Sequence, residues 1–236
     1  MDPTPLSGDP AEGPSRDVTL PPIRVDSLGQ QVFERIRDAI FGGSIQPGDL
    51  LRELQLARSL GVSQSTIREA LGQLENVGLV VRQPNRGTTV TRLSSKETGD
   101  RLRIRLALEE LAMADACPLI AAQDLAELED LARAITAAIA RNSYYEISQA
   151  DLAFHRRIWA IAGNALLERT LHAISLPLFA FLGVLQKSQL VNPAGSQPHE
   201  ELISALATRD PDTSRLAIRK HILLSHSSIL NQTETP

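Results

Sequence analysis

The chain has 236 residues, a formal net charge of −4, one cysteine and few aromatic side chains. This length suits a small domain plus a larger one with its own core, and the composition favours helical packing over a β-sandwich. The lone Cys117 excludes an internal disulfide framework, and the absence of a long apolar run or an apolar leader predicts a cytoplasmic protein with no membrane span. The negative net charge of the chain argues against a protein that coats nucleic acid nonspecifically through bulk charge.

Residues 1–26 are rich in proline and carry scattered acids and glycines, without a helical or strand period. This composition predicts a disordered N-terminal extension. An inert tail fits it better than a regulatory peptide does.

The segment around Gly61 combines the marks of two short helices joined by a tight turn. Gly61 is placed to end the first helix in a left-handed conformation, and Ser63 is placed to cap the second. In the second helix Ile67 and two later leucines recur at helical spacing and face the core. Four polar side chains are left on or near the outer face: Gln64, Ser65, Thr66 and Arg68. The pattern is typical of a helix-turn-helix.

Flanking segments complete a winged helix-turn-helix domain over residues 27–92. Upstream, one helical face is formed by Leu28, Val32, Ile36 and Ile40. Downstream, residues 79–82 and 88–92 are expected to form a hairpin whose turn spans residues 83–87. Eight arginines and six acidic residues give this segment a modest positive balance, so a dimer and specific contacts must supply much of any affinity for DNA.

Residues 95–231 contain helical segments separated by short breaks and no convincing strand pattern, which predicts an all-α bundle of six helices. The fold class is therefore mainly α. The predicted helices lie near residues 96–116, 122–141, 144–162, 165–188, 198–208 and 211–230.

Four residues of this bundle have side chains that bind metal ions. Asp151 and His155 lie four residues apart on one helical face, where both can bind the same ion. His199 comes near the start of the fifth helix and His221 midway along the last, so antiparallel packing would let all four converge. Three imidazoles and a carboxylate suit zinc, nickel, iron or manganese. On spacing alone, a surface hydrogen bond between Asp151 and His155 is the commoner arrangement.

Five stretches of the winged segment match a known pattern: Gly43–Gly48, Leu51–Ala57, Gly61–Ser63, Ile67–Leu71 and Arg86–Gly87. Through them the segment closely resembles the GntR family of bacterial regulators. The resemblance implies a homodimer on a short inverted repeat of double-stranded DNA, with recognition helices in the major groove and wing tips at the minor groove. The residues that it implies at the DNA are Ser63, Gln64, Ser65, Thr66, Arg68, Asn85, Arg86 and Gly87.

Two positions depart from the family pattern, because arginines often stand where this chain has Gln64 and Leu54. The usual operator sequence and affinity therefore do not transfer. Some DNA-facing residues also have a plainer interpretation: Ser63 as a cap only, Arg68 as the partner of a glutamate on its own helix, and Gly87 as a turn former.

The helical segment resembles the FCD ligand-binding domain of the FadR-type branch of GntR regulators. The matching pieces are Arg105–Glu109, Asp151–His155, Gly163–Asn164, His199–Leu206 and His221. Many members bind a divalent metal through one aspartate and three histidines. The resemblance thus implies a metal site, for zinc or nickel, at Asp151, His155, His199 and His221. Six helices rather than seven suggest the VanR-like subgroup.

The resemblance also implies a small organic acid as effector. Arg105 matches a position that lines the cavity in relatives, and its planar fork suits a carboxylate; a salt bridge to Glu109 is an equally good interpretation. Asn164 is a second candidate, although a turn and cap at Gly163–Asn164 is favoured. Four other residues are interpreted as ordinary helical or core residues: His172, His226, Phe154 and Trp159.

Together these features predict a DNA-binding regulator, in the commoner arrangement a repressor relieved by its effector. A metal sensor, in which the ion itself is the signal, is one alternative. A metal-dependent enzyme fused to a DNA-binding domain is another. The lack of an HExxH or nucleophile motif, beside a complete DNA-binding domain, argues against the enzyme.

Overall fold

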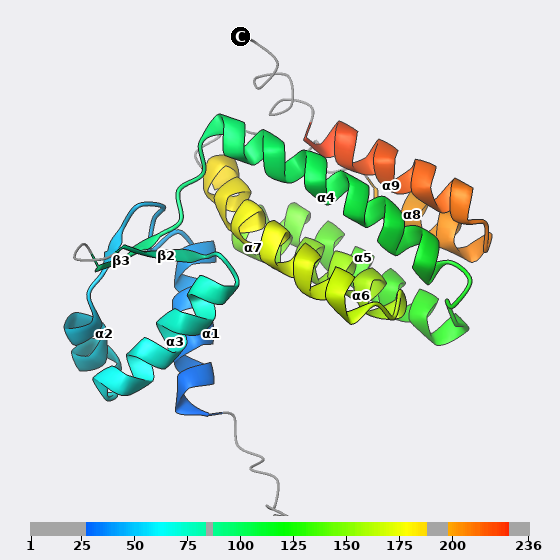
Figure 1. Cartoon of the computed structure of the whole chain (residues 1–236). Coiled ribbons are helices and arrows are strands. Elements are labelled where there is room, and N and C mark those ends of the chain that lie inside the picture. Colours follow the sequence, from blue (N-terminus) through cyan, green and yellow to red (C-terminus); the bar gives the residue numbers. More distant parts are fainter. Residues whose placement is uncertain (1–26, 84–86, 188–197, 227–236) are drawn as a thin grey trace, which may run out of the picture.

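The computed structural model describes residues 27–83, 87–187 and 198–226, which form a mainly α-helical protein of two parts (Figure 1). The first part contains α1 (Leu28–Phe41), β1 (Leu50–Leu51), α2 (Glu53–Leu60), α3 (Gln64–Asn76), β2 (Val80–Gln83) and β3 (Gly87–Val90). The second contains α4 (Ser95–Ala116), α5 (Ala122–Ala140), α6 (Tyr144–Ile161), α7 (Ala165–Lys187), α8 (Glu200–Ala207) and α9 (Pro211–Ser225). The predicted fold class is confirmed, while the predicted extension over residues 1–26 lies outside the described residues.

The first part is built around the apolar face of α3. Ile67, Leu71 and Leu74 are fully buried there, as their spacing predicted. Gly61 ends α2 with φ of +66°, a left-handed conformation that costs glycine little, and its N–H donates to the carbonyl of Ala57. On α1, Val32, Ile36 and Ile40 of the predicted face are buried, while Leu28 in the first turn is exposed.

A small antiparallel sheet follows α3, with strand order β1-β3-β2. Val80 of β2 pairs with Val90 of β3 as the hairpin pattern predicted, and Leu51 of β1 pairs with Thr88 on the other side of β3. The strand β1 was not predicted, because two residues are too few to show a period. Its extended conformation depends on pairing with β3.

The second part is a bundle in which α4 packs against α6, α7 and α9, and α5 packs against α6 and α8. Figure 1 shows α4 and α9 side by side along one edge. Ser94 and Glu97 form a capping box that fixes the start of α4. Helix bounds agree with the predictions to within two residues except at the end of α9, where residues 227–230 lie outside the described part. In the described part, no helix is long and apolar enough to cross a membrane.

The two parts meet where the end of α3 approaches the middle of α7. Gly78, two residues after the end of α3, has φ of +74°, and a Cβ atom there would lie 3.1 Å from Cγ of Pro177 in α7. Helix α1 also contacts α7. Beside this contact, a cavity of about 450 Å³ separates the end of α3 from α6 and α7 and includes His172 in its wall. The segment directly after α3 and helix α1 thus connect the first part to the bundle.

Candidate nucleic-acid interface and metal centre

The start of α3 presents short polar side chains to solvent. The Oγ atom of Ser63 accepts the backbone N–H of Thr66 at 3.2 Å and lies 2.7 Å from the hydroxyl oxygen of Ser65. Ser63, Gln64 and Ser65 are exposed, and Thr66 is half-buried. Ser63 is therefore the helix cap that the sequence predicted. Contacts of the neighbouring hydroxyls and amide with phosphates or base edges stay predictions.

Arg68 lies on the exposed side of α3 and forms an ion pair across the two helices. Its Nε atom is 2.7 Å from Oε2 of Glu53 on α2, and 60% of its side chain is exposed. A surface partner was the plainer interpretation, but the partner is not Glu69 or Glu75 of its own helix. Because an exposed ion pair contributes little free energy, a phosphate or a guanine can replace Glu53 at small cost.

The wing presents Gly87 at the first position of β3. Its φ of +87° favours glycine, and a Cβ atom there would lie 3.1 Å from Cδ1 of Leu50, so this residue has a conformational role of its own. Asn85 and Arg86 lie outside the described residues, and their contacts with DNA stay predictions.

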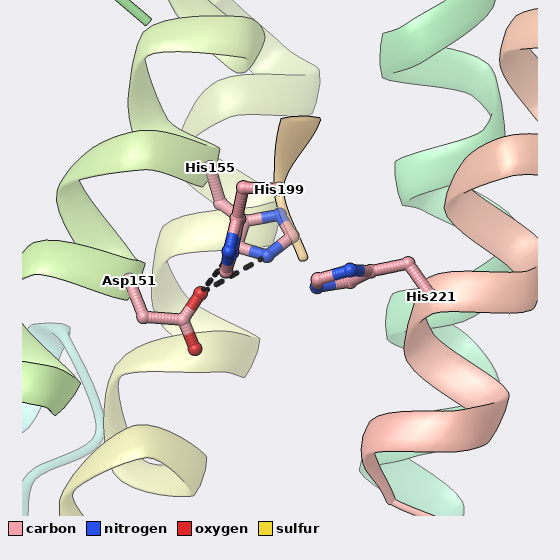
Figure 2. A group of neighbouring side chains, drawn as sticks. All are labelled: Asp151, His155, His199 and His221. Atoms are coloured by element: carbon pink, nitrogen blue, oxygen red, sulfur yellow. Dashed lines mark hydrogen bonds and ion pairs between the residues drawn. The ribbon is translucent and has the colours of Figure 1, made fainter. Parts of the chain in front are cut away.

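Inside the bundle, the four predicted metal ligands converge, as Figure 2 shows. Asp151 and His155 come from α6, His199 directly precedes α8, and His221 points across from α9. Oδ1 of Asp151 is 2.9 Å from Nε2 of His199 and 3.5 Å from Nε2 of His155. One possible ligand atom from each residue lies within 4.8 Å of the others. All three histidines are buried, so Asp151 and His155 are not a surface pair.

The donor set fits a divalent transition metal. Bonds from zinc to nitrogen or oxygen are about 2.0–2.2 Å long, so two ligand atoms of a tetrahedral ion lie about 3.3–3.6 Å apart. The four atoms, which lie within 4.8 Å of one another, would therefore move closer together by up to about 1 Å to share an ion. Nδ1 of His221 is buried and has no hydrogen-bond partner among the described residues.

Burial and mutual charge set the protonation states of this cluster. Burial alone would raise the pKa of Asp151, but a hydrogen bond from His199 and the charges of His199 and His155 hold it below its usual value. Burial lowers the pKa of His221 well below its usual value, and His199 and His155 lower it further. The carboxylate is therefore ionised and His221 neutral near pH 7, which are the forms that bind metals.

A second layer of buried polar groups surrounds Glu109 on α4. Its Oε1 lies 3.0 Å from Nε of Arg105 and 3.2 Å from Nδ1 of His155, and its Oε2 accepts the Nε1–H of Trp159 at 2.8 Å. All four side chains are at most 1% exposed. The sequence predicted Glu109 only as a partner of Arg105, four residues away. The approach of His155 and Trp159 depends on the packing of α6 against α4, which no local pattern encodes.

Arg105 forms the salt bridge to Glu109 that was one of its two predicted roles. Its guanidinium carbon also lies 4.7 Å from the centre of the Phe179 ring, within the range of a cation–π contact. Its Nη1 atom is buried and has no hydrogen-bond partner in the described part of the chain. One nitrogen of the guanidinium group is therefore fixed by Glu109, while another is a buried donor without a partner among the described residues.

Asn164 lies apart from this cluster, on the surface at the start of α7. Its Oδ1 accepts the backbone N–H groups of Leu166 and Leu167, which is the capping role that its sequence context favoured. His172 and His226 are not among the clustered ligands, and burial lowers the pKa of each to about 4. Phe154 and Trp159 are fully buried, as predicted.

Comparison with known proteins covers both parts of the chain. Residues 28–90 match the family described as bacterial regulatory proteins, gntR family, and residues 100–224 match the FCD domain. The HTH-type transcriptional regulator McbR of Escherichia coli K12 is 28% identical over 210 residues, which cover 87% of this chain and 94% of McbR. A probable D-xylose utilization operon transcriptional repressor of Paenarthrobacter nicotinovorans is 26% identical over 210 residues, 87% of this chain and 90% of that protein.

A solved structure of E. coli McbR/YncC has the same fold, with a TM-score of 0.75 at 26% identity over 87% of this chain and 98% of that one. A winged helix-turn-helix joined to a helical FCD domain defines the class of DNA-binding transcriptional regulators. The chain belongs to the GntR family, in the branch that carries an FCD domain, and this is a family of regulators rather than enzymes.

Proposed function

We propose that this protein is a repressor that binds an inverted-repeat operator as a homodimer and whose operator affinity is controlled by a small organic acid at a metal ion in the bundle. In this proposal residues 27–92 bind the DNA, and residues 95–231 bind the metal, the effector and the second subunit. The convergence of Asp151, His155, His199 and His221 carries the proposal. Repression is supported by the name of the relative from P. nicotinovorans.

Zinc or nickel would be held by these four residues and would supply a Lewis acid that attracts a ligand carboxylate. Arg105 supports an acidic ligand independently, because its Nη1 is a buried charged donor with no partner among the described residues. A metal ion and a guanidinium together favour an anion over a neutral ligand. A carboxylate that contacts both would be fixed in orientation.

Helix α7 supplies a physical connection from this site to the DNA-binding part. Phe179 lies under the guanidinium of Arg105, and Pro177, two residues earlier, faces Gly78 at the end of α3. A ligand that moves Arg105 therefore acts on the helix that supports the recognition helix. Differential affinity of the ligand for two positions of α7 would change operator affinity.

A homodimer is supported by exposed apolar side chains, spaced seven residues apart on each of the neighbouring helices α4 and α9. Ile104 and Leu111 of α4 and Leu216 and Leu223 of α9 are all large and exposed. Such an arrangement is typical of a contact between subunits. Light scattering of the full chain is expected to give twice the chain mass of 25.7 kDa.

The metal site is tested by elemental analysis of protein purified without chelators or nickel resin. We expect about one zinc or nickel ion per wild-type chain and loss of the ion in His221→Ala. His172→Ala, which removes a histidine of α7 outside the cluster, is the matched control and should keep the metal. A wild-type protein with no bound metal, and no thermal shift on adding zinc or nickel, would show that the metal proposal is wrong.

A metal sensor is the second candidate, and the number of ligands favours it. Four protein ligands complete a tetrahedral shell, as in structural zinc sites, so the ion needs no organic ligand to be held. Metal titration of operator binding, with and without organic acids, separates the two. If the metal alone changes operator affinity and acids add nothing, the protein is a metal sensor.

A further inference from the structure

Glu109 is the only carboxylate among the described residues that lies within ion-pair distance of both His155 and Arg105. We infer that Glu109 is a positioning residue, which fixes His155 for metal binding and couples the metal ion to Arg105. This inference rests on the proposed metal site. It assigns to Glu109 a role beyond that of a salt-bridge partner.

The two ring nitrogens of His155 face different carboxylates. Nε2 faces Asp151 in the cluster at 3.5 Å, while Nδ1 faces Oε1 of Glu109 at 3.2 Å. Nδ1 of His155 has no hydrogen-bond partner among the described residues, although Oε1 of Glu109 lies within ion-pair distance of it. A small rotation of the ring that turned an Nδ1–H toward this acceptor would leave the lone pair of Nε2 directed at the cluster. Carboxylates in this position orient metal-binding histidines and raise their basicity.

Glu109 is itself held in place by neighbouring side chains. Nε of Arg105 donates to its Oε1 at 3.0 Å. Trp159 fixes the second carboxylate oxygen at 2.8 Å. The carboxylate therefore cannot rotate away from His155 without breaking a buried hydrogen bond.

One oxygen of Glu109 faces both Arg105 and His155, which supplies the coupling. A metal ion held at Nε2 would make an Nδ1–H of His155 a stronger donor toward Oε1, where Arg105 already donates. Arg105 would then be freer to engage an acidic ligand. By linkage, the acid strengthens metal binding by the same factor.

The single tryptophan of the chain makes this layer observable. Trp159 donates to Glu109, and its ring centre lies 6.5 Å from that of His155. Tryptophan fluorescence therefore reports on this one site. Zinc titration should change it in the wild-type protein.

The test compares zinc affinity, by competition with a chelator, in three variants of the full chain. Glu109→Gln removes the carboxylate charge, and Glu109→Gln with Arg105→Gln removes it while leaving no unpaired buried arginine. Glu110→Gln is the control, because Glu110 lies on α4 beside Glu109 but forms its ion pair at the surface, with Arg219 of α9. We expect zinc binding about 10–100-fold weaker in the first two and unchanged in the control.

The double variant distinguishes two roles of Glu109, the positioning of His155 and the neutralisation of the charge on Arg105. It also tests the inference if Glu109→Gln alone does not fold. Wild-type zinc affinity in the double variant would show that Glu109 only neutralises Arg105, which overturns the inference and leaves the metal site standing. A wild-type protein that binds no zinc by competition or by Trp159 fluorescence would overturn both.

Discussion

The two parts of the protein contain the same kind of ion pair in opposite settings. Arg68 and Glu53 pair at 2.7 Å in the winged part, where 60% and 29% of their side chains are exposed. Arg105 and Glu109 pair at 3.0 Å in the bundle, where exposure is 1% and 0%. Water and salt screen the charges of the exposed pair. In the buried pair water cannot reach the charges, so each charge is stabilised by its partner instead.

This difference shows how each part combines binding with stability. The winged part takes its stability from an apolar core and keeps its candidate DNA contacts on the surface, so those contacts can change without unfolding the domain. The bundle builds its candidate site from charges inside the core. Substitutions there change ligand binding and stability together.

The largest expected effect follows from removing one charge of the buried pair. Arg105→Met leaves Glu109 without its arginine and should lower the free energy of unfolding by about 3–5 kcal/mol. Urea denaturation measures this. Arg103→Met, at an exposed ion pair of the same helix with Asp100, should cost less than about 1 kcal/mol. A similar decrease in the free energy of unfolding in both variants would contradict the expected difference between buried and exposed ion pairs.

An intermediate effect is expected where the two parts meet. Gly78→Ala places a Cβ atom 3.1 Å from Pro177 at φ of +74°, so the free energy of unfolding should fall by at least about 1–2 kcal/mol. Gly72→Ala within α3 meets no atom within 4 Å and should instead raise it by about 0.5–1 kcal/mol. Urea denaturation of both variants measures these two changes in the free energy of unfolding, which are expected to have opposite signs. A stabilised Gly78→Ala protein would mean that the two parts do not meet at this glycine.

The smallest effect on stability is expected at Arg68. Arg68→Met should change the free energy of unfolding by less than about 1 kcal/mol, yet weaken operator binding by about 1–3 kcal/mol in a gel-shift titration. Arg133→Met, at an exposed ion pair with Asp130 on α5, is the control and should leave operator affinity unchanged. Full operator affinity in Arg68→Met would remove this residue from the DNA-contact set.

The secondary structure of the described residues was largely predictable, because long helices carry their own signals. Ser63 and Gly61 mark helix ends through local hydrogen bonds and φ preference, and both have those roles in the structure. Strand β1 and the exposure of Leu28 were not predictable. Both depend on which distant segment supplies a partner or leaves a residue uncovered.

The candidate metal ligands were only partly predictable. Asp151 and His155 are related by the helical repeat, so the sequence alone places them on one face. The addition of His199 and His221 relied on the resemblance to a family, since nothing local links α6 to α8 and α9. The structure brings all four together and shows that the histidines are buried.

The sequence by itself determined that this chain carries a winged helix-turn-helix and a helical bundle, because caps, turns and apolar periodicity act within a few residues. Only the tertiary structure decided that Glu109 connects Arg105, His155 and Trp159, and that Pro177 lies against Gly78. These contacts depend on how separate helices pack. Packing is set by the shape and burial of the whole core, which no single stretch of sequence specifies.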